Sequence, residues 1–176
     1  RFAAQMSDAL TQGVRASPDV RVTTVPWIPQ MKSSWQLVPF KRLVVLQRGF
    51  DLPQQDRVEG NVPVVSSGGV IDRHNVAAVR GPGIVTGRYG TIGEVAYVDE
   101  GYWPLNTALY SREFHGNSVR FAYHVLRWLK PQVESLSAKA AVSGVDRNDL
   151  HQLLIALPPL EEQVEVAGFL DKALVE

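Results

Sequence analysis

Residues 81–97 have the sequence GPGIVTGRYGTIGEVAY, and the rest of the chain is organised around them. Two short β-branched runs, IVT and VAY, flank a turn that carries Arg88 and Tyr89 and has a glycine at every third position. This pattern predicts a strand, a tight turn and a second strand. The glycines supply backbone freedom where a side chain would obstruct either a positive φ or the close approach of a partner. We therefore expect the turn to display a cation and an aromatic ring at a place of close contact.

The composition is that of an ordinary globular protein. The chain has 176 residues, of which 45% are hydrophobic and 20% charged, enough to bury a core within one domain. It has no cysteine, which excludes disulfides and thiolate metal sites and fits an intracellular setting. No apolar run approaches the ~20 residues that span a bilayer, and the first residues do not resemble a secretory signal. We expect a soluble, cytoplasmic protein with no membrane partner.

The charge is balanced overall but unevenly distributed. Lys and Arg outnumber Asp and Glu by four to two over residues 1–40 and by 13 to 11 over residues 41–150. Residues 151–176 hold one cation against five carboxylates. A mildly basic body is compatible with a nucleic-acid partner even though the net charge is zero.

Hydrophobic periodicity predicts strands first and helices later. Strand-like runs occur at residues 20–25, 62–65, 84–86, 95–97 and 102–110, and a strand with a short apolar element at 35–46. Residues 118–130 are spaced as an amphipathic helix, a second short helix is expected at 133–141, a strand at 153–157 and a last helix at 160–174. Residues 1–17 have weak helical character and are expected to form a loosely held arm. The fold class is therefore mixed α+β.

Motifs for catalysis or cofactor binding are missing from the sequence. No Gly-Lys-Ser/Thr follows the glycines, which excludes a Walker loop, and their spacing is not the dinucleotide fingerprint. The four histidines are far apart and form no His-x-x-x-His pair, which argues against zinc. The run at residues 66–69, SSGG, is not a nucleophile elbow. We expect no catalysis, no cofactor and no metal; an active site assembled from distant residues stays open.

Several motifs together resemble a known family. They are WQLVPFKRL at 35–43, GFDLP at 49–53, VPVVSSGGVI at 62–71, GIVTGRYGTIG at 83–93, WPLNT at 103–107 and LPPLEEQ at 157–163. Their order and spacing over about residues 26–174 resemble the target recognition domain of the specificity subunit of type I restriction-modification enzymes. The resemblance implies a β-rich target recognition domain with packed helices and a C-terminal partner-docking helix.

The same resemblance implies a division of the chain and a set of partners. Residues 1–25 would be an unassigned N-terminal arm, 26–159 the DNA target recognition domain, and 160–176 the start of a conserved coiled-coil helix. Such a subunit binds double-stranded DNA without catalysis and directs methylation and restriction by methyltransferase and restriction subunits. A half-length subunit that pairs with a second specificity half through its C-terminal helix, a truncated product and a fragment all stay open.

Candidate DNA contacts come from the side-chain chemistry of the predicted loops. Arg, Asn and Gln read base edges in the major groove, whereas Lys, Arg, Ser and Thr hold phosphates. The candidates are Arg48, Gln54, Gln55, Ser66, Ser67, His74, Asn75, Arg88, Tyr89, Thr91, Lys139 and Arg147. An alternative for Arg88 and Tyr89 is that they only shape the turn.

The last helix is the candidate for partner docking. Acidic residues near its start are favourable beside the positive end of the helix dipole. The candidates are Glu161, Glu162, Gln163, Val164, Ala167, Leu170 and Leu174. This helix could instead merely cover the sheet. Two other classes also stay open: a non-catalytic protein-interaction module that uses the C-terminal helix, and an enzyme with an unrecognised pocket.

Overall fold

The structure is a computed structural model that describes residues 1–15 and 19–175. Residues 16–18, which fall in the predicted arm, and residue 176, at the end of the predicted docking helix, lie outside the described residues. The helices are α1 (Phe2–Gln12), α2 (Val119–Trp128), α3 (Lys130–Lys139), α4 (Arg147–His151) and α5 (Leu160–Val175), with 3-10 turns η1 (Phe40–Arg42) and η2 (Gln54–Asp56). The strands are β1 (Val20–Val25), β2 (Ile28–Lys32), β3 (Gln36–Pro39), β4 (Val45–Arg48), β5 (Val62–Ser66), β6 (Gly69–His74), β7 (Gly83–Gly87), β8 (Val95–Val98), β9 (Trp103–Pro104), β10 (Ala108–Glu113) and β11 (Leu154–Leu157). The mixed α+β class is confirmed.

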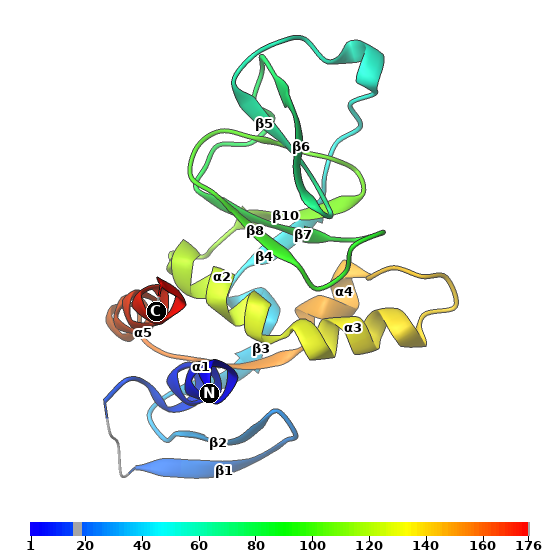
Figure 1. Cartoon of the computed structure of the whole chain (residues 1–176). Helices are drawn as coiled ribbons and strands as arrows, with labels where there is room; N and C mark the ends of the chain where they lie inside the picture. The colour runs from blue at the N-terminus through cyan, green and yellow to red at the C-terminus, as the bar shows by residue number, and fades with distance from the viewer. Residues whose placement is uncertain (16–18, 176) are drawn as a thin grey trace.

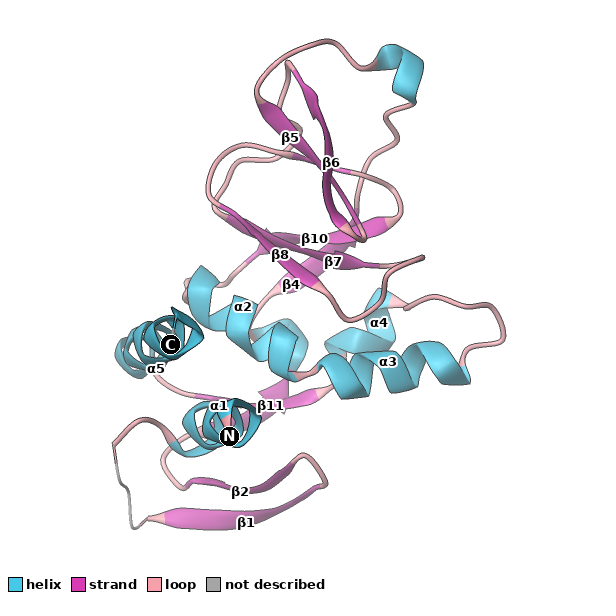
Figure 2. Ribbon diagram, viewed as in Figure 1, coloured by secondary structure: helices cyan, strands magenta, loops and turns pink. Residues whose placement is uncertain are grey.

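A four-stranded sheet in the order β4-β10-β7-β8 forms the centre of the molecule. Figure 1 shows the β6-β5-β9 sheet on one side of it and helices α2, α3 and α4 on the other. The β1-β2 hairpin and the β11-β3 pair lie beyond these helices, together with α1 (Figure 2). The central sheet is thus covered on the helical side by the main core and on the other side by a second, smaller sheet.

The predicted strand–turn–strand is confirmed as the β7–β8 hairpin, which pairs antiparallel from Gly83 with Val98 to Thr86 with Val95. Gly90 and Gly93 have φ values of +76° and +83°, which glycine adopts without steric cost. Gly87 is needed for a different reason, because a Cβ there would lie 1.8 Å from the Thr91 carbonyl oxygen. The close approach at Gly87 is therefore made by the backbone of the turn itself rather than by a partner molecule.

The N-terminal helix α1 is part of the main core. Met6, Ala9 and Leu10 are almost fully buried and belong to the same cluster as Phe121 of α2 and Leu170 of α5. The expectation of a loosely held arm is wrong for residues 2–12, because this helix packs its apolar side against four other elements, β2, β11, α2 and α5. Helix α1 therefore contributes buried side chains to the same core as α2 and α5.

Helix α2 confirms the predicted amphipathic helix, with boundaries set by local chemistry. The Ser118 hydroxyl accepts a hydrogen bond from the Phe121 N–H at 3.1 Å and caps its start. Pro131 stands in the first turn of α3, where its missing N–H costs nothing. The proline therefore does not end the helical structure, because a second helix, α3, begins at Lys130.

Candidate nucleic-acid interface

Main-chain hydrogen bonds hold the turn that carries Arg88 and Tyr89. The N–H groups of both residues donate to the Thr107 carbonyl, at 2.9 and 3.1 Å, and the Arg88 carbonyl accepts from the Val145 N–H at 2.9 Å. The turn is thereby fixed to the segment before β10 on one side and to the loop before α4 on the other. Three segments that are distant in the sequence meet at this point.

The Tyr89 ring is fixed by contacts on two sides. The Arg88 guanidinium lies 4.5 Å from the ring centroid, in the range of a cation–π contact. A Cβ at Gly144 would lie 2.6 Å from the ring, so only glycine fits beside it. Tyr89 nevertheless remains 41% exposed, and Val142 across the same surface is 74% exposed. An ordered aromatic ring and an exposed aliphatic side chain thus stand together at the surface.

These residues line a cavity of about 350 Å³, which we call the aromatic cleft. Its lining residues are Arg48, Arg88, Tyr89, Leu109, Ala140, Val142, Gly144, Val145, Asp146, Arg147 and Asn148. The structure therefore brings together four of the predicted candidates, Arg48, Arg88, Tyr89 and Arg147. A fifth, Lys139, is exposed and directly precedes a lining residue.

The turn between β5 and β6 approaches the same hairpin. A Cβ at Gly90 would lie 3.0 Å from the Ser67 hydroxyl, and a Cβ at Gly68 would lie 3.7 Å from the Thr91 hydroxyl. Ser67 and Thr91 thus adjoin the turn beside the aromatic cleft. The Ser66 hydroxyl, in contrast, bonds within its own turn, to the Gly69 carbonyl and the Gly68 N–H, both at 3.3 Å.

The remaining candidates lie elsewhere. Gln54 and Gln55 are exposed on η2, at the tip of the three-stranded sheet (Figure 1). Asn75 follows β6 and is exposed. His74 is only 7% exposed; its Nδ1 accepts from the Val58 N–H at 3.0 Å, and its ring meets Trp103 edge-on. Because that imidazole is engaged inside the chain, we do not include it in the interface.

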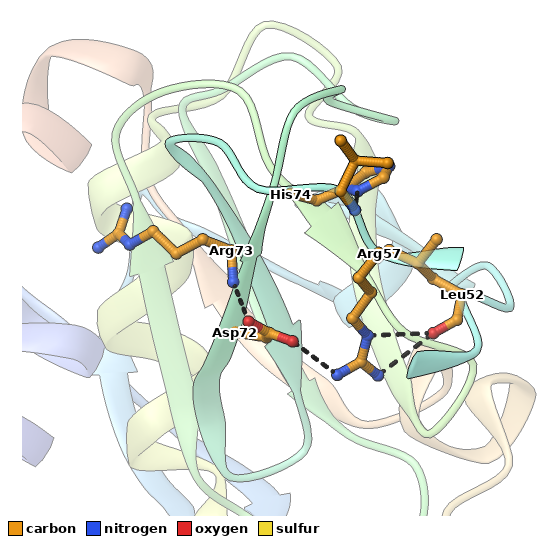
Figure 3. A network of polar contacts seen from close by, with 6 residues as sticks. Leu52, Arg57, Asp72, Arg73 and His74 are labelled. Atoms are coloured by element: carbon orange, nitrogen blue, oxygen red, sulfur yellow. Dashed lines mark hydrogen bonds and ion pairs between the residues drawn. The ribbon is translucent and has the colours of Figure 1, made fainter. Parts of the chain in front are cut away.

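A polar network ties the loop after β4 to β6 (Figure 3). The Arg57 guanidinium donates to the Leu52 carbonyl at 3.2 and 3.3 Å and to the Asp72 carboxylate at 3.1 Å. A hydrogen bond from the Arg73 N–H and a second from Arg57 hold the pKa of Asp72 below its usual range. Arg57 therefore stabilises the outer sheet instead of standing as a solvated surface charge.

A second cavity, of about 400 Å³, lies next to the aromatic cleft and is called the basic pocket here. It is lined by Lys41, Arg42, Val45, Arg112, His115, Arg147, Asn148 and His151. Arg147 and Asn148 line both cavities, so the two adjoin at the start of α4. The lining of the basic pocket includes four Lys or Arg side chains and no carboxylate.

Sequence reasoning named only Arg147 among the residues of the basic pocket. The adjacent cations Lys41 and Arg42 were the one local hint, although two neighbouring cations alone are a weak signal. Arg112 and His151 carried no such signal. They meet Lys41 only because β10 pairs with β4 and α4 packs beside them.

The predicted docking residues of α5 are divided between the interior and the surface. Gln163 is 1% exposed, and its amide donates to Asn117 Oδ1 at 2.8 Å and to the Pro158 carbonyl at 2.9 Å while accepting from the Ser118 N–H at 2.9 Å. Ala167 and Leu170 are also buried in the core. The structure places these three residues in the interior of this chain, so they offer no surface to a partner.

Glu162 is engaged as well. Its carboxylate accepts from Lys32 Nζ at 2.7 Å and from the Trp35 indole N–H at 3.0 Å. Burial by itself raises the pKa of Glu162, but these two hydrogen bonds, together with the charges of Lys32 and Arg15, outweigh it and the pKa is lowered. Four apolar side chains of α5 do face outward: Leu160, Val164, Leu174 and Val175. The predicted docking residue Glu161 is also exposed.

The described residues offer neither a metal-binding cluster nor a membrane-spanning helix. Residues 1–15 and 19–175 contain no cluster of three or more His, Asp or Glu side chains placed to hold a metal ion. None of the helices in this part of the chain is both long and apolar enough to cross a membrane.

Comparisons with known proteins agree with each other. A family model described as the type I restriction modification DNA specificity domain matches residues 32–174. A putative type I restriction enzyme MjaX specificity subunit of Methanocaldococcus jannaschii is 38% identical over 47 residues, which is 27% of this chain and 11% of that protein.

Solved structures show the same fold. The specificity subunit from M. genitalium matches with a TM-score of 0.71 and 14% identity over 81% of this chain and 40% of its own. The HsdS subunit from Thermoanaerobacter tengcongensis matches with a TM-score of 0.69 and 15% identity over 99% of this chain and 42% of its own. A chain from a study of complex assembly and conformational transition in the type I R-M system matches with a TM-score of 0.72 and 16% identity over 99% and 43%. This chain therefore spans about two fifths of the length of these solved structures.

Proposed function

The chain belongs to the family of type I restriction modification DNA specificity domains, as its motifs predicted, and on this basis we propose that it binds one half of a bipartite site in double-stranded DNA. It would thereby direct methylation and restriction by partner subunits without catalysing either reaction. The observation that carries the proposal is the aromatic cleft, where Arg48, Arg88 and Arg147 from three distant segments meet beside Tyr89.

The side chains of the aromatic cleft suit the edges of base pairs. An Arg guanidinium donates two parallel hydrogen bonds to guanine O6 and N7, and each such pair contributes about 1–3 kcal/mol of discrimination. Arg88 is preorganised for this role because its charge lies over Tyr89 and one N–H donates to the Asn106 carbonyl at 3.4 Å. Arg48 approaches Asp51 only at 3.9 Å in an exposed pair, which is too weak to hold it from DNA.

The carboxylate in the cleft does not cancel these charges by direct pairing. Asp146 accepts from the Asn148 N–H at 2.7 Å and caps α4. Among the described residues it forms no ion pair with the arginines around it. The cleft therefore keeps cationic donors for an acceptor-rich ligand.

The outward face of α5 supports the partner part of the proposal. Leu160 and Val164 are 51% and 58% exposed one helical turn apart, and Val175 is 89% exposed. Such a stripe suits a helix of a methyltransferase subunit or of a second specificity half. In this proposal residues 26–159 form the DNA module, residues 160–176 begin the docking helix, restriction subunits join the same assembly, and the complex acts in the cytoplasm. The same stripe is what favours the alternative, a protein-interaction module without DNA binding.

A binding selection tests the proposal. The chain is mixed at low salt with a pool of random duplexes, and retained duplexes are amplified and sequenced. We expect enrichment of a short motif and an affinity that falls steeply with salt, because phosphate contacts release counterions. Arg88→Ala should lose about 1–3 kcal/mol and relax preference at one base pair. A folded chain that retains no duplex at low salt would overturn the DNA function and favour the interaction module.

A further inference from the structure

We propose that the basic pocket binds a phosphate of the DNA backbone and so anchors the duplex while the aromatic cleft reads its bases. This inference rests on the proposed function and adds a division of labour to it. Contacts to phosphate fix the register of a protein on the duplex, whereas contacts to base edges carry sequence information. The two adjoining cavities differ accordingly: the aromatic cleft combines arginines with Tyr89 and Val142, whereas the basic pocket is lined by four cations and no carboxylate.

The cations of the basic pocket are not neutralised inside the protein. Lys32, Arg57, Arg120 and Lys130 each contact a carboxylate. By contrast, Lys41, Arg42 and Arg147 are exposed and take part in none of the ion pairs formed within residues 1–15 and 19–175. Arg112 donates to the neutral amide of Gln47 at 3.3 Å. Four cations that form no ion pair within the described residues, around one cavity, create a positive potential that attracts an anion, although the Asp146 carboxylate at the start of α4 lies nearby.

His151 adds a neutral donor to the same lining. Its Nε2 accepts from the Leu46 N–H at 2.9 Å, so the neutral ring carries its proton on Nδ1. His151 is 7% exposed, and burial, followed by the charges of Arg147 and Lys41, lowers its pKa. The Asp146 carboxylate opposes this shift but does not reverse it. A phosphate oxygen in this pocket would meet the charged donors of Lys and Arg and the Nδ1–H of His151, whose tautomer is fixed by the bond from Leu46.

The register of two strands places the pocket at a suitable distance from the cleft. On β4, Val45 lines the basic pocket and Arg48 lines the aromatic cleft. On β10, Arg112 lines the basic pocket and Leu109 lines the aromatic cleft. The strands are antiparallel, with Leu109 opposite Arg48 and Glu113 opposite Val45. Three strand residues span about 10 Å, which is about three base-pair steps of 3.4 Å. One strand of a duplex can therefore contact both cavities within a few nucleotides.

The test separates phosphate anchoring from base reading. The variant Lys41→Gln/Arg42→Gln is compared with wild type on the selected duplex and on a scrambled duplex of equal length, over a range of salt concentrations. The control, Arg21→Gln/Arg80→Gln, removes two exposed cations from β1 and from the loop before β7. We expect the pocket variant to lower affinity for both duplexes by the same factor and to reduce the salt slope by about 2. The control should leave the slope unchanged.

The possible outcomes distinguish failure of the phosphate-anchoring role from failure of the proposed DNA function. Loss of affinity confined to the selected duplex would show that Lys41 and Arg42 read bases, which overturns the anchoring role. A slope equal to that of the control would also overturn it while leaving the DNA function intact. Absence of salt-dependent binding by the wild type would overturn the DNA function itself. Thermal unfolding of both variants establishes that they fold, and Arg112→Gln, with an expected slope change of about 1, repeats the test from a different element.

Discussion

His124 Nε2 lies 2.7 Å from a carboxylate oxygen of Asp171, and this contact joins α2 to α5. The imidazole is fully buried, while Asp171 also accepts from Arg120 at 2.7 Å. Arg120 in turn lies over the rings of Tyr97 and Tyr123, at 4.7 and 4.6 Å. The contact therefore fixes the C-terminal helix to the body of the domain through a stacked cation and a buried ring.

The pH dependence of stability should report on this contact. Burial lowers the pKa of His124 from its ordinary 6.5, although the hydrogen bond to Asp171 opposes the shift. Nδ1 has no hydrogen-bond partner among the described residues, so a second proton there would be a buried donor without an acceptor. The neutral ring thus contributes stability that is present above pH 6.5 and is lost as the pH falls below it. Urea unfolding from pH 7.5 to 5.5 measures the loss, at most about 1.4 kcal/mol per pH unit.

His124→Gln is the matched variant for that measurement, because its amide can still donate to Asp171 but takes up no proton. The variant should lose less stability than wild type over the same pH range. His151 also has a lowered pKa and contributes equally to both proteins, so the difference between the two curves isolates His124. Parallel curves would show that His124 does not titrate in this range.

Gln163→Ala should destabilise the domain by about 2–4 kcal/mol, because three polar groups around the amide lose their partner. Gln152→Ala, an exposed glutamine just after α4, is the control and should change the free energy of unfolding by less than about 0.5 kcal/mol. Chemical denaturation of both variants makes the comparison. A stable Gln163→Ala variant that fails only in complex assembly would return this residue to partner docking.

Two glycine substitutions should have opposite effects. Gly87→Ala places a Cβ 1.8 Å from the Thr91 carbonyl, so the β7–β8 turn must open and both stability and DNA affinity should fall. Gly168→Ala lies within α5 with no atom within 4 Å, and should stabilise the domain by about 0.5–1 kcal/mol. Thermal melts and duplex binding assays compare the two. Equal stability of the variants would contradict the packing of the turn.

Val164→Asp should leave the isolated chain as stable as wild type, because the side chain is 58% exposed on α5. It should nevertheless abolish association through that face, since a carboxylate would enter an apolar contact. Sedimentation of the chain alone and with the methyltransferase subunit measures the effect, with Val22→Asp on β1, 77% exposed, as the control. Equal association of both variants would exclude this face of α5 as the docking surface.

Local signals predicted the local structure well. The glycine-spaced turn, the helix capped by Ser118 and the last helix depend on short-range spacing and capping, and the structure contains all three. The family followed from motif order, since each motif is short. Helix α1 was underrated because its weak pattern of Met6 and Leu10 acquires meaning only in the folded chain, where the helix packs against β2, β11, α2 and α5.

The site was predictable only in part because it is assembled by long-range pairing. Arg48, Arg88 and Arg147 stood in separate predicted loops, and their convergence depends on β4 pairing with β10 and on the bond between Val145 and Arg88. Whether a polar side chain faces outward could not be predicted from its type. His74 and Gln163 have the chemistry of binding residues, yet both satisfy hydrogen bonds inside the chain.

The turn at Arg88 and Tyr89 is secured by the peptide groups of Thr107 and Val145 and by a glycine at position 87, none of which involves the side chains that the cleft displays. The main-chain groups that hold the turn are therefore distinct from the side chains that line the cleft. If the cleft reads DNA as proposed, exchange of Arg88, Val142 or Arg147 would alter which base pairs are preferred while the main-chain contacts that hold the turn remain. Under the proposed function, a domain built in this way would acquire a new DNA target through a few substitutions in the cleft, while its helical core stays as it is.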